Sequence, residues 1–280
     1  MNAISISKLE KDYKKFKLEI DELNVKSGYI TGFIGPNGSG KTTTIKSILG
    51  MIKPDKGSIE VLPKKDIGYV GDESGYLLES KVVSIKKIIS RFYENWDEDL
   101  YSKYINRFGI VEEKLIKDLS KGQKRQFELI MALCHHPKLL IMDEPTSSLD
   151  PIVRNEFLEL IQEHMDIDNM TVFYSTHITS DLDKAADYII LIYKGKIILY
   201  GEKDEIINNH IIVKGKKEIL DDDIKKDFIA ININAYGFEG LMDNKDTAYE
   251  LFGEEAVYEK VNLEDLILYY TRGNISEKNN

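Results

Sequence analysis

Eight consecutive residues between two apolar runs constrain the fold of this 280-residue chain more than any other stretch. They follow the pattern G-x-x-x-x-G-K-[ST] and are Gly35, Pro36, Asn37, Gly38, Ser39, Gly40, Lys41 and Thr42. Glycines let successive backbone N–H groups converge on an anion, and the N-terminus of a following helix favours negative charge. The stretch therefore predicts a phosphate-binding loop between a strand and a helix.

The sequence on both sides of this loop has the pattern that such a loop requires. Residues 29–34 predict a buried strand, and residues 43–49 predict a helix that ends at a glycine. Lys41 can reach the β- and γ-phosphates of a nucleotide, and the Thr42 hydroxyl suits Mg²⁺. Thr43, which begins the helical run, is included among the nucleotide-binding residues. The alternative, a glycine-rich turn followed by a lysine, is disfavoured by the flanking patterns.

Two acids follow a second predicted strand. Residues 139–142 are continuously apolar, as expected of a parallel strand that is buried on both faces. Ligands of open α/β sheets bind at the carboxyl ends of such strands, where Asp143 and Glu144 stand. Asp143 suits Mg²⁺, directly or through water, and Glu144 could orient and deprotonate an attacking water. The alternative, a pair of solvated acids, is disfavoured because the phosphate loop is present.

The succession of patterns along the chain predicts an α/β fold with appended parts. Strands alternate with helices around the loop, which predicts a P-loop NTPase core with a parallel sheet. Alternation in the first 34 residues predicts an antiparallel β subdomain, and helical spacing predicts a helical lobe at about residues 79–135. We expect a nucleotide-binding domain over residues 1–210 and a small α+β C-terminal appendage over residues 211–280.

Composition and charge exclude several classes of protein. The formal net charge of −10 argues against a general nucleic-acid or anionic-membrane surface. We read no secretion signal at the N-terminus and no apolar run of about 18 residues, the length that a membrane span needs. The expected location is therefore cytoplasmic, and any membrane-spanning part would be another chain. The single cysteine, Cys134, lies in an apolar stripe and is expected in the core.

Five motifs stand in one order along the chain. They are the phosphate loop, residues 119–123 (LSKGQ), residues 143–146 (DEPT), residues 147–150 (SSLD) and His177 after a strand. Together they resemble the nucleotide-binding cassette of ATP-binding cassette (ABC) transporters, and the resemblance covers about residues 1–210. The resemblance implies an ATPase that uses ATP and Mg²⁺. It also implies a second nucleotide-binding domain, as a homodimer or heterodimer, and a separate transmembrane permease subunit. The arrangement is closest in style to bacterial ABC-2 type exporter ATPases, with peripheral attachment to the inner face of the membrane.

The resemblance also implies roles for residues outside the loop. Ser120, Gly122 and Gln123 would form a second anion site that caps the γ-phosphate bound by the opposite protomer. Asp150 would lie at the dimer seam. His177 would hydrogen-bond the γ-phosphate and hold the attacking water in line with the carboxylate that follows the second strand.

Tyr13 aligns with the aromatic residue that stacks on adenine in such cassettes, although an ordinary surface tyrosine is a nearly equal alternative. Two positions depart from the family pattern. Lys121 replaces a usual glycine, which we expect to matter little. Asp72 replaces a usual glutamine that helps to hold Mg²⁺, so its place among the metal ligands, with Thr42 and Asp143, stays open.

Two other functions remain as alternatives. One is an ABC ATPase without transport, such as a DNA-repair or ribosome-bound relative. Long coiled-coil insertions, zinc-binding cysteines or a second cassette usually mark those forms, and this sequence contains none. The other is a nucleotide-sensing or regulatory ABC ATPase that hydrolyses ATP slowly, which Asp72 keeps open. The sequence leaves the cargo and the direction of transport undecided.

Overall fold

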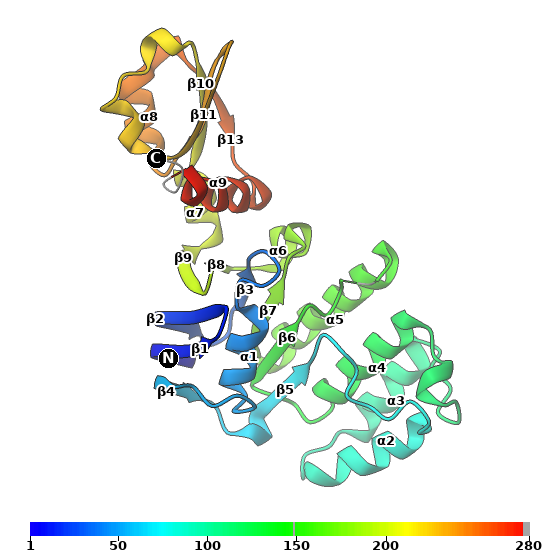
Figure 1. Ribbon diagram of the computed structural model, residues 1–280. Helices are drawn as coiled ribbons and strands as arrows, with labels where there is room; N and C mark the ends of the chain where they lie inside the picture. The colour runs from blue at the N-terminus through cyan, green and yellow to red at the C-terminus, as the bar shows by residue number, and fades with distance from the viewer. Residues whose placement is uncertain (148, 277–280) are drawn as a thin grey trace.

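A six-stranded sheet forms the centre of the computed structural model, which describes residues 1–147 and 149–276. Its order is β5-β6-β7-β3-β8-β9 (Figure 1). The first five strands run parallel, and β9 pairs with β8 antiparallel. The strands are β3 Ile30–Ile34, β5 Ile67–Val70, β6 Leu139–Asp143, β7 Thr171–Thr176, β8 Tyr188–Tyr193 and β9 Lys196–Glu202. The parallel sheet expected from the sequence is confirmed.

The two faces of this sheet are both covered, so its central strands are buried throughout. In β6, Leu140 and Met142 point into one apolar cluster, whereas Leu139 and Ile141 point into the other. This alternation follows from the two-residue period of a strand. Helix α1 (Lys41–Ile48) covers one face, and α5 (Pro151–Asp168) and α6 (Thr179–Ala185) pack into the cluster on the other.

A three-stranded antiparallel sheet in the order β2-β1-β4 lies beside α1 (Figure 1). Its inward residues, among them Ile4, Leu18 and Ile20, join the cluster of α1. The antiparallel β subdomain expected from the alternation is therefore present. Its strands are β1 Asn2–Tyr13, β2 Phe16–Lys26 and β4 Lys56–Val61.

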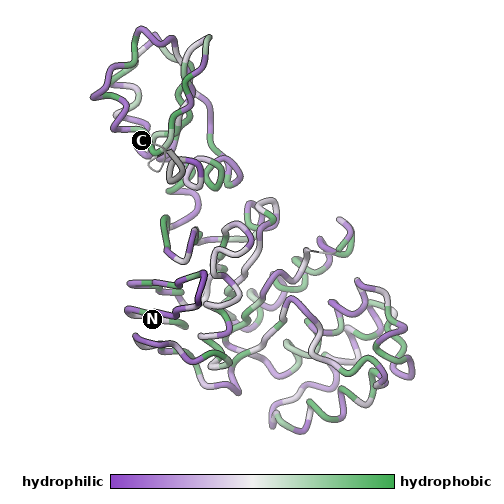
Figure 2. The backbone as a smooth tube through the Cα atoms, in the orientation of Figure 1, coloured by the Kyte–Doolittle hydropathy of each residue, from purple (hydrophilic) through white to green (hydrophobic). Residues whose placement is uncertain are grey.

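Three helices make up a helical lobe at the opposite side of the central sheet (Figure 1). Hydrophilic and hydrophobic residues alternate along them, as the tube in Figure 2 shows. Tyr101, Tyr104 and Ile105 are the buried side of the middle helix, which begins at the N-cap Asp97. The helices are α2 Val82–Ile89, α3 Glu98–Arg107 and α4 Lys121–Leu133. Cys134, the C-cap of α4, is buried as expected.

The last part of the chain forms a separate four-stranded antiparallel sheet in the order β11-β12-β10-β13. Helix α9 packs on β11 and reaches α6 of the central unit, because Leu263, Leu266 and Leu182 share one apolar cluster. The boundary at residue 210 stays a prediction. These elements are α7 Lys203–Asn209, β10 Ile211–Gly215, β11 Phe228–Asn234, β12 Gly237–Met242, α8 Lys245–Phe252, β13 Val257–Lys260 and α9 Leu263–Ser276.

Short 3-10 helices connect several elements. They are η1 Lys64–Asp66, η2 Ser90–Phe92, η3 Ile116–Asp118, η4 Lys217–Ile219, η5 Ile224–Asp227 and η6 Gly253–Glu255. Within the described ranges, none of the helices combines the length and apolar character needed to cross a membrane. Ser148, part of the SSLD motif, lies outside the described residues.

Candidate functional site

The loop between β3 and α1 has a backbone that only glycine adopts easily. Gly38 has a φ of +78° and Gly40, the N-cap of α1, has a φ of +118°. A Cβ at Gly35 would lie 2.2 Å from the Ile192 carbonyl oxygen, so this position admits no side chain without movement. Gly38 and Gly40 therefore supply the left-handed turns of the loop, and Gly35 permits its close approach to β8.

Lys41 lies inside the curve of this loop. Its Nζ donates to the carbonyl oxygens of Gly35 at 2.7 Å and Pro36 at 3.4 Å. The same ammonium group lies 3.3 Å from Glu144 Oε1, and Lys41 is only 5% exposed. Ser39, whose N–H donates to the Pro36 carbonyl oxygen, completes the turn. The loop thus holds a nearly buried positive charge at its centre.

Glu144 connects this lysine to a histidine, His177, that directly follows the neighbouring strand β7. It follows β6 in a left-handed conformation, with a φ of +49°, and its N–H donates to the Ser175 carbonyl oxygen. Its Oε2 accepts from His177 Nδ1 at 2.7 Å and from the His177 N–H at 3.3 Å. An ionised carboxylate can only accept, so Nδ1 carries the proton in this contact. Glu144 therefore contacts both Lys41 and His177, which come from separate segments of the chain.

Asp143 is a buried carboxylate at the end of β6. It is 1% exposed, and neither of its side-chain oxygens has a partner among the described residues. Burial raises the pKa of Asp143; the nearby hydroxyls of Thr42 and Ser175 oppose this rise, and the charges of Glu144 and Asp72 add to it. Because buried polar groups are rarely left unpaired, this carboxylate and the exposed Thr42 hydroxyl fit a hard cation such as Mg²⁺.

A pocket of about 630 Å³ opens over the loop. The expected residues that line it are Asn37, Gly38, Gly40, Lys41, Thr42, Thr43, Asp72 and Glu144. Lys15 and Phe16 also line it, and sequence reasoning missed both. Tyr13 is 41% exposed and its ring centroid lies 6.4 Å from that of Phe16, so Phe16 is the aromatic ring nearer the phosphate loop. The adenine-stacking role of Tyr13 stays a prediction.

The remaining expected residues lie at the N-termini of two neighbouring helices. Ser120 is the N-cap of α4, where its Oγ accepts from the Gln123 N–H at 3.1 Å, and Gln123 Oε1 accepts from the Ser120 N–H at 3.3 Å. A Cβ at Gly122 would lie 3.2 Å from Val153 Cγ1, so α4 and α5 begin side by side. Asp150 caps α5. None of these four expected residues lines the pocket over the phosphate loop.

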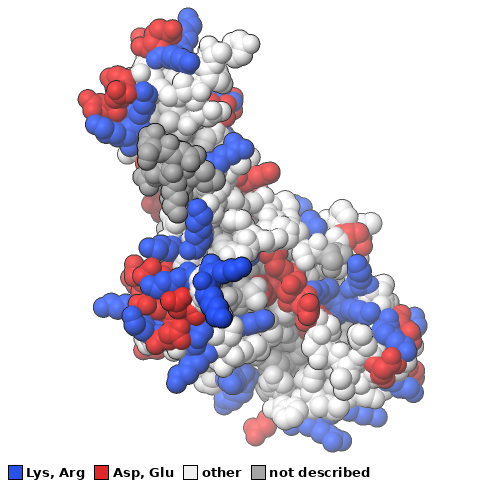
Figure 3. Space-filling view, in the orientation of Figure 1, with Lys and Arg blue, Asp and Glu red and all other residues white. Residues whose placement is uncertain are grey.

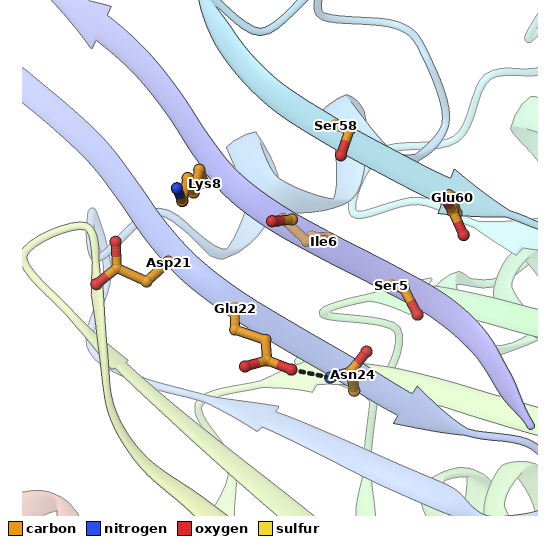
Figure 4. A pocket seen from close by; sticks show the side chains of 9 residues that line it. Ser5, Ile6, Lys8, Asp21, Glu22, Asn24, Ser58 and Glu60 are labelled. Carbon is orange, nitrogen blue, oxygen red and sulfur yellow. Dashed lines mark hydrogen bonds between the residues drawn. The ribbon is translucent and has the colours of Figure 1, made fainter.

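A second hollow lies on the antiparallel sheet (Figure 4). Its charged lining consists of Lys8 and three acids, Asp21, Glu22 and Glu60. Glu22 accepts a hydrogen bond from Asn24 at 2.6 Å. An acidic lining repels an anion, so this hollow does not compete with the phosphate loop as a nucleotide site.

The fold and the loop define the class of protein: a P-loop nucleotide-binding protein. A solved structure titled as the ATP-binding subunit of an ABC transporter has a TM-score of 0.66 and 24% identity, and covers 74% of this chain and 92% of its own. The cbiO1 structure from Clostridium perfringens, titled as part of the ABC transporter complex cbiONQ, has a TM-score of 0.62 and 26% identity. It covers 74% of this chain and 91% of its own.

The chain belongs to the ABC transporter family, as an ATP-binding subunit. The family model described as "ABC transporter" matches residues 18–147. The bacitracin transport ATP-binding protein BcrA of Bacillus licheniformis is 30% identical over 87% of this chain and 83% of its own length. The lantibiotic transport ATP-binding protein SrtF of Streptococcus pyogenes is 31% identical over 76% of this chain and 100% of its own length. The family hydrolyses ATP.

Proposed function

We propose that this chain binds and hydrolyses ATP with Mg²⁺ and thereby drives a separate membrane-spanning permease subunit. The observation that carries the proposal is the contact of Glu144 with both Lys41 and His177 at the phosphate loop. Beside it lies the buried carboxylate of Asp143, which has no hydrogen-bond partner among the residues that the structure describes. A protein in this role would be cytoplasmic and attached to the inner face of the membrane through the permease.

The chemistry follows from the positions of these groups. Lys41 and the N–H groups of the loop hold the phosphates, and Glu144 takes the proton of the attacking water. His177 hydrogen-bonds Glu144 and would orient that carboxylate and the γ-phosphate toward the water. Thr42 and Asp143, with Asp72 as a further candidate, would hold Mg²⁺. The ion would neutralise charge that develops on the phosphate oxygens.

The complete site requires a second nucleotide-binding domain. Ser120, Gly122, Gln123 and Asp150 lie away from the pocket of Lys41, at the exposed N-termini of α4 and α5. The backbone N–H groups at such a terminus bind anions. We infer that these residues contact the nucleotide bound by a partner domain, either a second copy or a related chain.

Export is the direction of transport that we favour. The names of BcrA and SrtF say that these relatives serve bacitracin and lantibiotic transport, respectively. Because the cargo path belongs to the permease subunit, the ATP-binding chain does not select the cargo. Nucleic acid is a disfavoured partner, since basic and acidic side chains are interspersed on the face shown in Figure 3 and the net charge is −10.

A nucleotide-sensing ABC ATPase without transport is the second candidate, and Asp72 favours it. Asp72 lines the phosphate pocket, where it adds a negative charge close to a triphosphate. Weak hydrolysis with tight ATP binding would fit this alternative.

ATP turnover tests the proposal most simply. We expect Mg²⁺-dependent hydrolysis by the purified chain and a decrease of about 10²–10⁴-fold in the Glu144→Gln variant, the range typical of a lost general base. The variant should still bind ATP, because Lys41 and the loop are intact. A parent chain that binds ATP without hydrolysing it would instead support the sensing function.

A further inference from the structure

One buried arginine ties the loop after β5 to the helical lobe. Arg125, in α4, is 8% exposed, and its Nη1 donates to the Gly71 carbonyl oxygen at 2.6 Å. Its Nη2 donates to the Asp72 carbonyl oxygen, and Nη1 lies 2.7 Å from Glu128 Oε2 in the same helix. The planar guanidinium can hold three acceptors in fixed directions, which the compact ammonium of lysine cannot do equally well.

A second contact holds the same loop against α4. The ring of Tyr76 packs against Phe127, with the ring centroids 5.5 Å apart. The Tyr76 side chain is partly buried against the apolar cluster that contains Phe127, and burial, with a smaller effect from the charge of Glu128, raises the pKa of Tyr76. The loop over residues 71–76 is therefore attached to α4 by its backbone at one end and by a side chain at the other.

The residue whose backbone Arg125 holds is also a residue of the nucleotide pocket. Asp72 lines that pocket together with Lys41, Thr42 and Glu144. Glu144 directly follows Asp143 in the chain, so Asp72 shares the pocket with the end of β6. Arg125 does not line the pocket, so it acts there only through the loop.

We propose that Arg125 is a positioning residue that holds Asp72 at the pocket, so that Asp72 helps this site to bind ATP together with a divalent cation. The inference rests on the proposed function, because it requires ATP at the phosphate loop. It concerns a feature particular to this chain, a carboxylate at position 72 whose backbone is fixed from α4. The N-cap of that helix is Ser120, so one element would contact the partner's nucleotide and also hold a residue of the chain's own pocket.

The test needs a variant that removes the arginine without leaving a buried charge. Removing Arg125 alone would leave Glu128, which is 7% exposed, without its cation. Arg125→Met combined with Glu128→Gln avoids this and keeps two good helix formers. Glu128→Gln alone keeps both hydrogen bonds to the loop but leaves the Arg125 charge without its carboxylate, so it is the control for any effect of lost stability. Two further variants complete the set. One is Asp72→Asn, and the other combines Asp72→Asn with Arg125→Met and Glu128→Gln.

The measurement is the dissociation constant of ATP by calorimetry, first in EDTA and then with Mg²⁺, with no turnover needed. We expect Mg²⁺ to strengthen ATP binding by the parent. This strengthening should shrink by about tenfold in both Asp72→Asn and the Arg125→Met, Glu128→Gln variant, the size typical of a lost positioning partner. The variant with all three substitutions should lose no more of the Mg²⁺ effect than Asp72→Asn or the Arg125→Met, Glu128→Gln variant, since all of these changes act through the Asp72 carboxylate. Glu128→Gln alone should keep the Mg²⁺ effect of the parent, although the fold loses stability.

Hydrogen exchange of residues 71–76 supplies a second readout. We expect faster exchange in the Arg125→Met, Glu128→Gln variant but not in Asp72→Asn, because only the former frees the loop. Additive losses of the Mg²⁺ effect, or an unchanged effect in either variant, would overturn the inference. If the parent chain binds no ATP in either buffer, both the proposed function and this inference are wrong. If the parent binds ATP normally in EDTA, a failed Mg²⁺ result counts against the inference alone.

Discussion

At the scale of single residues, the backbone turn at Glu144 is as important as its carboxylate. A non-glycine residue with a φ of +49° stores strain of about 1–3 kcal/mol, which the surrounding contacts must offset. Here the Glu144 N–H donates to the Ser175 carbonyl oxygen, and its carboxylate contacts Lys41 and His177. These contacts fix the direction of the carboxylate toward the phosphate loop.

The nearly buried ammonium of Lys41 gives the first residue-scale prediction. We expect Lys41→Ala to lower ATP turnover by at least about 10²-fold, because the loop loses a charged contact that stabilises the transition state. Binding of ATP should weaken as well. The exposed Lys46→Ala variant, in the same helix, is the matched control and should retain turnover near that of the parent. Equal turnover in the two variants would contradict the placement of the phosphates at this loop.

The sequence could predict the phosphate loop and the two acids because local patterns determine them. Gly38, Gly40 and Lys41 lie within one short segment, and their chemistry follows from its backbone. The aromatic ring beside the pocket was harder to predict, because the hairpin of β1 and β2 decides which ring turns toward the loop. Tyr13 pairs with Phe16 in that hairpin, and Phe16 lines the pocket.

At the scale of elements, a histidine just after the C-cap of α4 should make stability depend on pH. His135 is 1% exposed and stacks on Tyr93 with the ring centroids 3.9 Å apart. Burial lowers the pKa of His135 to about 4. The unfolded chain, with a histidine pKa of about 6.5, binds a proton that the folded chain does not bind between these values. Stability should therefore be lost as the pH falls from about 6.5 to 4.

A His135→Phe variant tests this prediction by urea unfolding at pH 7 and pH 5. In the parent, His135 should lower the free energy of unfolding by about 2 kcal/mol at pH 5 compared with pH 7. The variant keeps an aromatic ring against Tyr93 and should lack this loss. A difference between parent and variant that is the same at both pH values would show that His135 does not titrate differently on folding.

A buried hydrogen-bonded group joins the segment after Glu144 to α6. Thr146 Oγ1 donates to Asp181 Oδ2 at 2.6 Å, and Tyr174 OH donates to the same oxygen at 2.8 Å. We expect Tyr174→Phe to lower the unfolding free energy by about 1–3 kcal/mol, because one acceptor loses its buried donor. Denaturant unfolding measures this. The matched control Tyr29→Phe, at a residue 45% exposed, should change stability by less than about 0.5 kcal/mol. Equal effects would contradict a role for the buried network.

The elements of residues 1–210 were mostly predictable, and those of the appendage were not. Strands such as β6 are continuous apolar runs, and α5 begins with Asp150 and Pro151 as its start signals. In the appendage, β12 contains Gly237 and Gly240, which weaken a strand pattern. The appendage contains both strands and helices, as the expected α+β character requires, whereas β12, β13 and α8 were not predicted individually. Two sets of hydrogen bonds also depend on tertiary contacts that no local sequence pattern encodes. One joins Arg125 to the backbone of the loop over residues 71–76, and the other joins Thr146 to Asp181.

At the scale of the whole molecule, the contact of α9 with α6 joins the appendage to the central unit. Leu266 is fully buried in the apolar cluster that contains Leu182 of α6. We expect Leu266→Ala to lower the unfolding free energy by about 2–5 kcal/mol, in one transition that includes both parts. Leu268 lies in the same helix and is 39% exposed, so Leu268→Ala is the matched control and should change the unfolding free energy only slightly. Two separate unfolding transitions in the parent would show that the parts are not coupled.

Two sets of expected nucleotide-binding residues lie at different places on the surface of the molecule. Lys41 and Glu144 face one pocket, while Ser120 and Asp150 cap helices elsewhere on the surface. We therefore expect two copies, or this chain and a related one, to enclose two nucleotides between them.

The solution mass of the Glu144→Gln variant, by sedimentation with and without ATP and Mg²⁺, tests the central claim most directly. Slow hydrolysis should let ATP hold the assembly closed, so we predict the mass of one chain without ATP and of two chains with ATP. Adding Ser120→Glu should prevent the doubling, because a carboxylate would repel the partner's γ-phosphate. A variant that binds ATP and keeps the mass of one chain would contradict a site completed by a second copy.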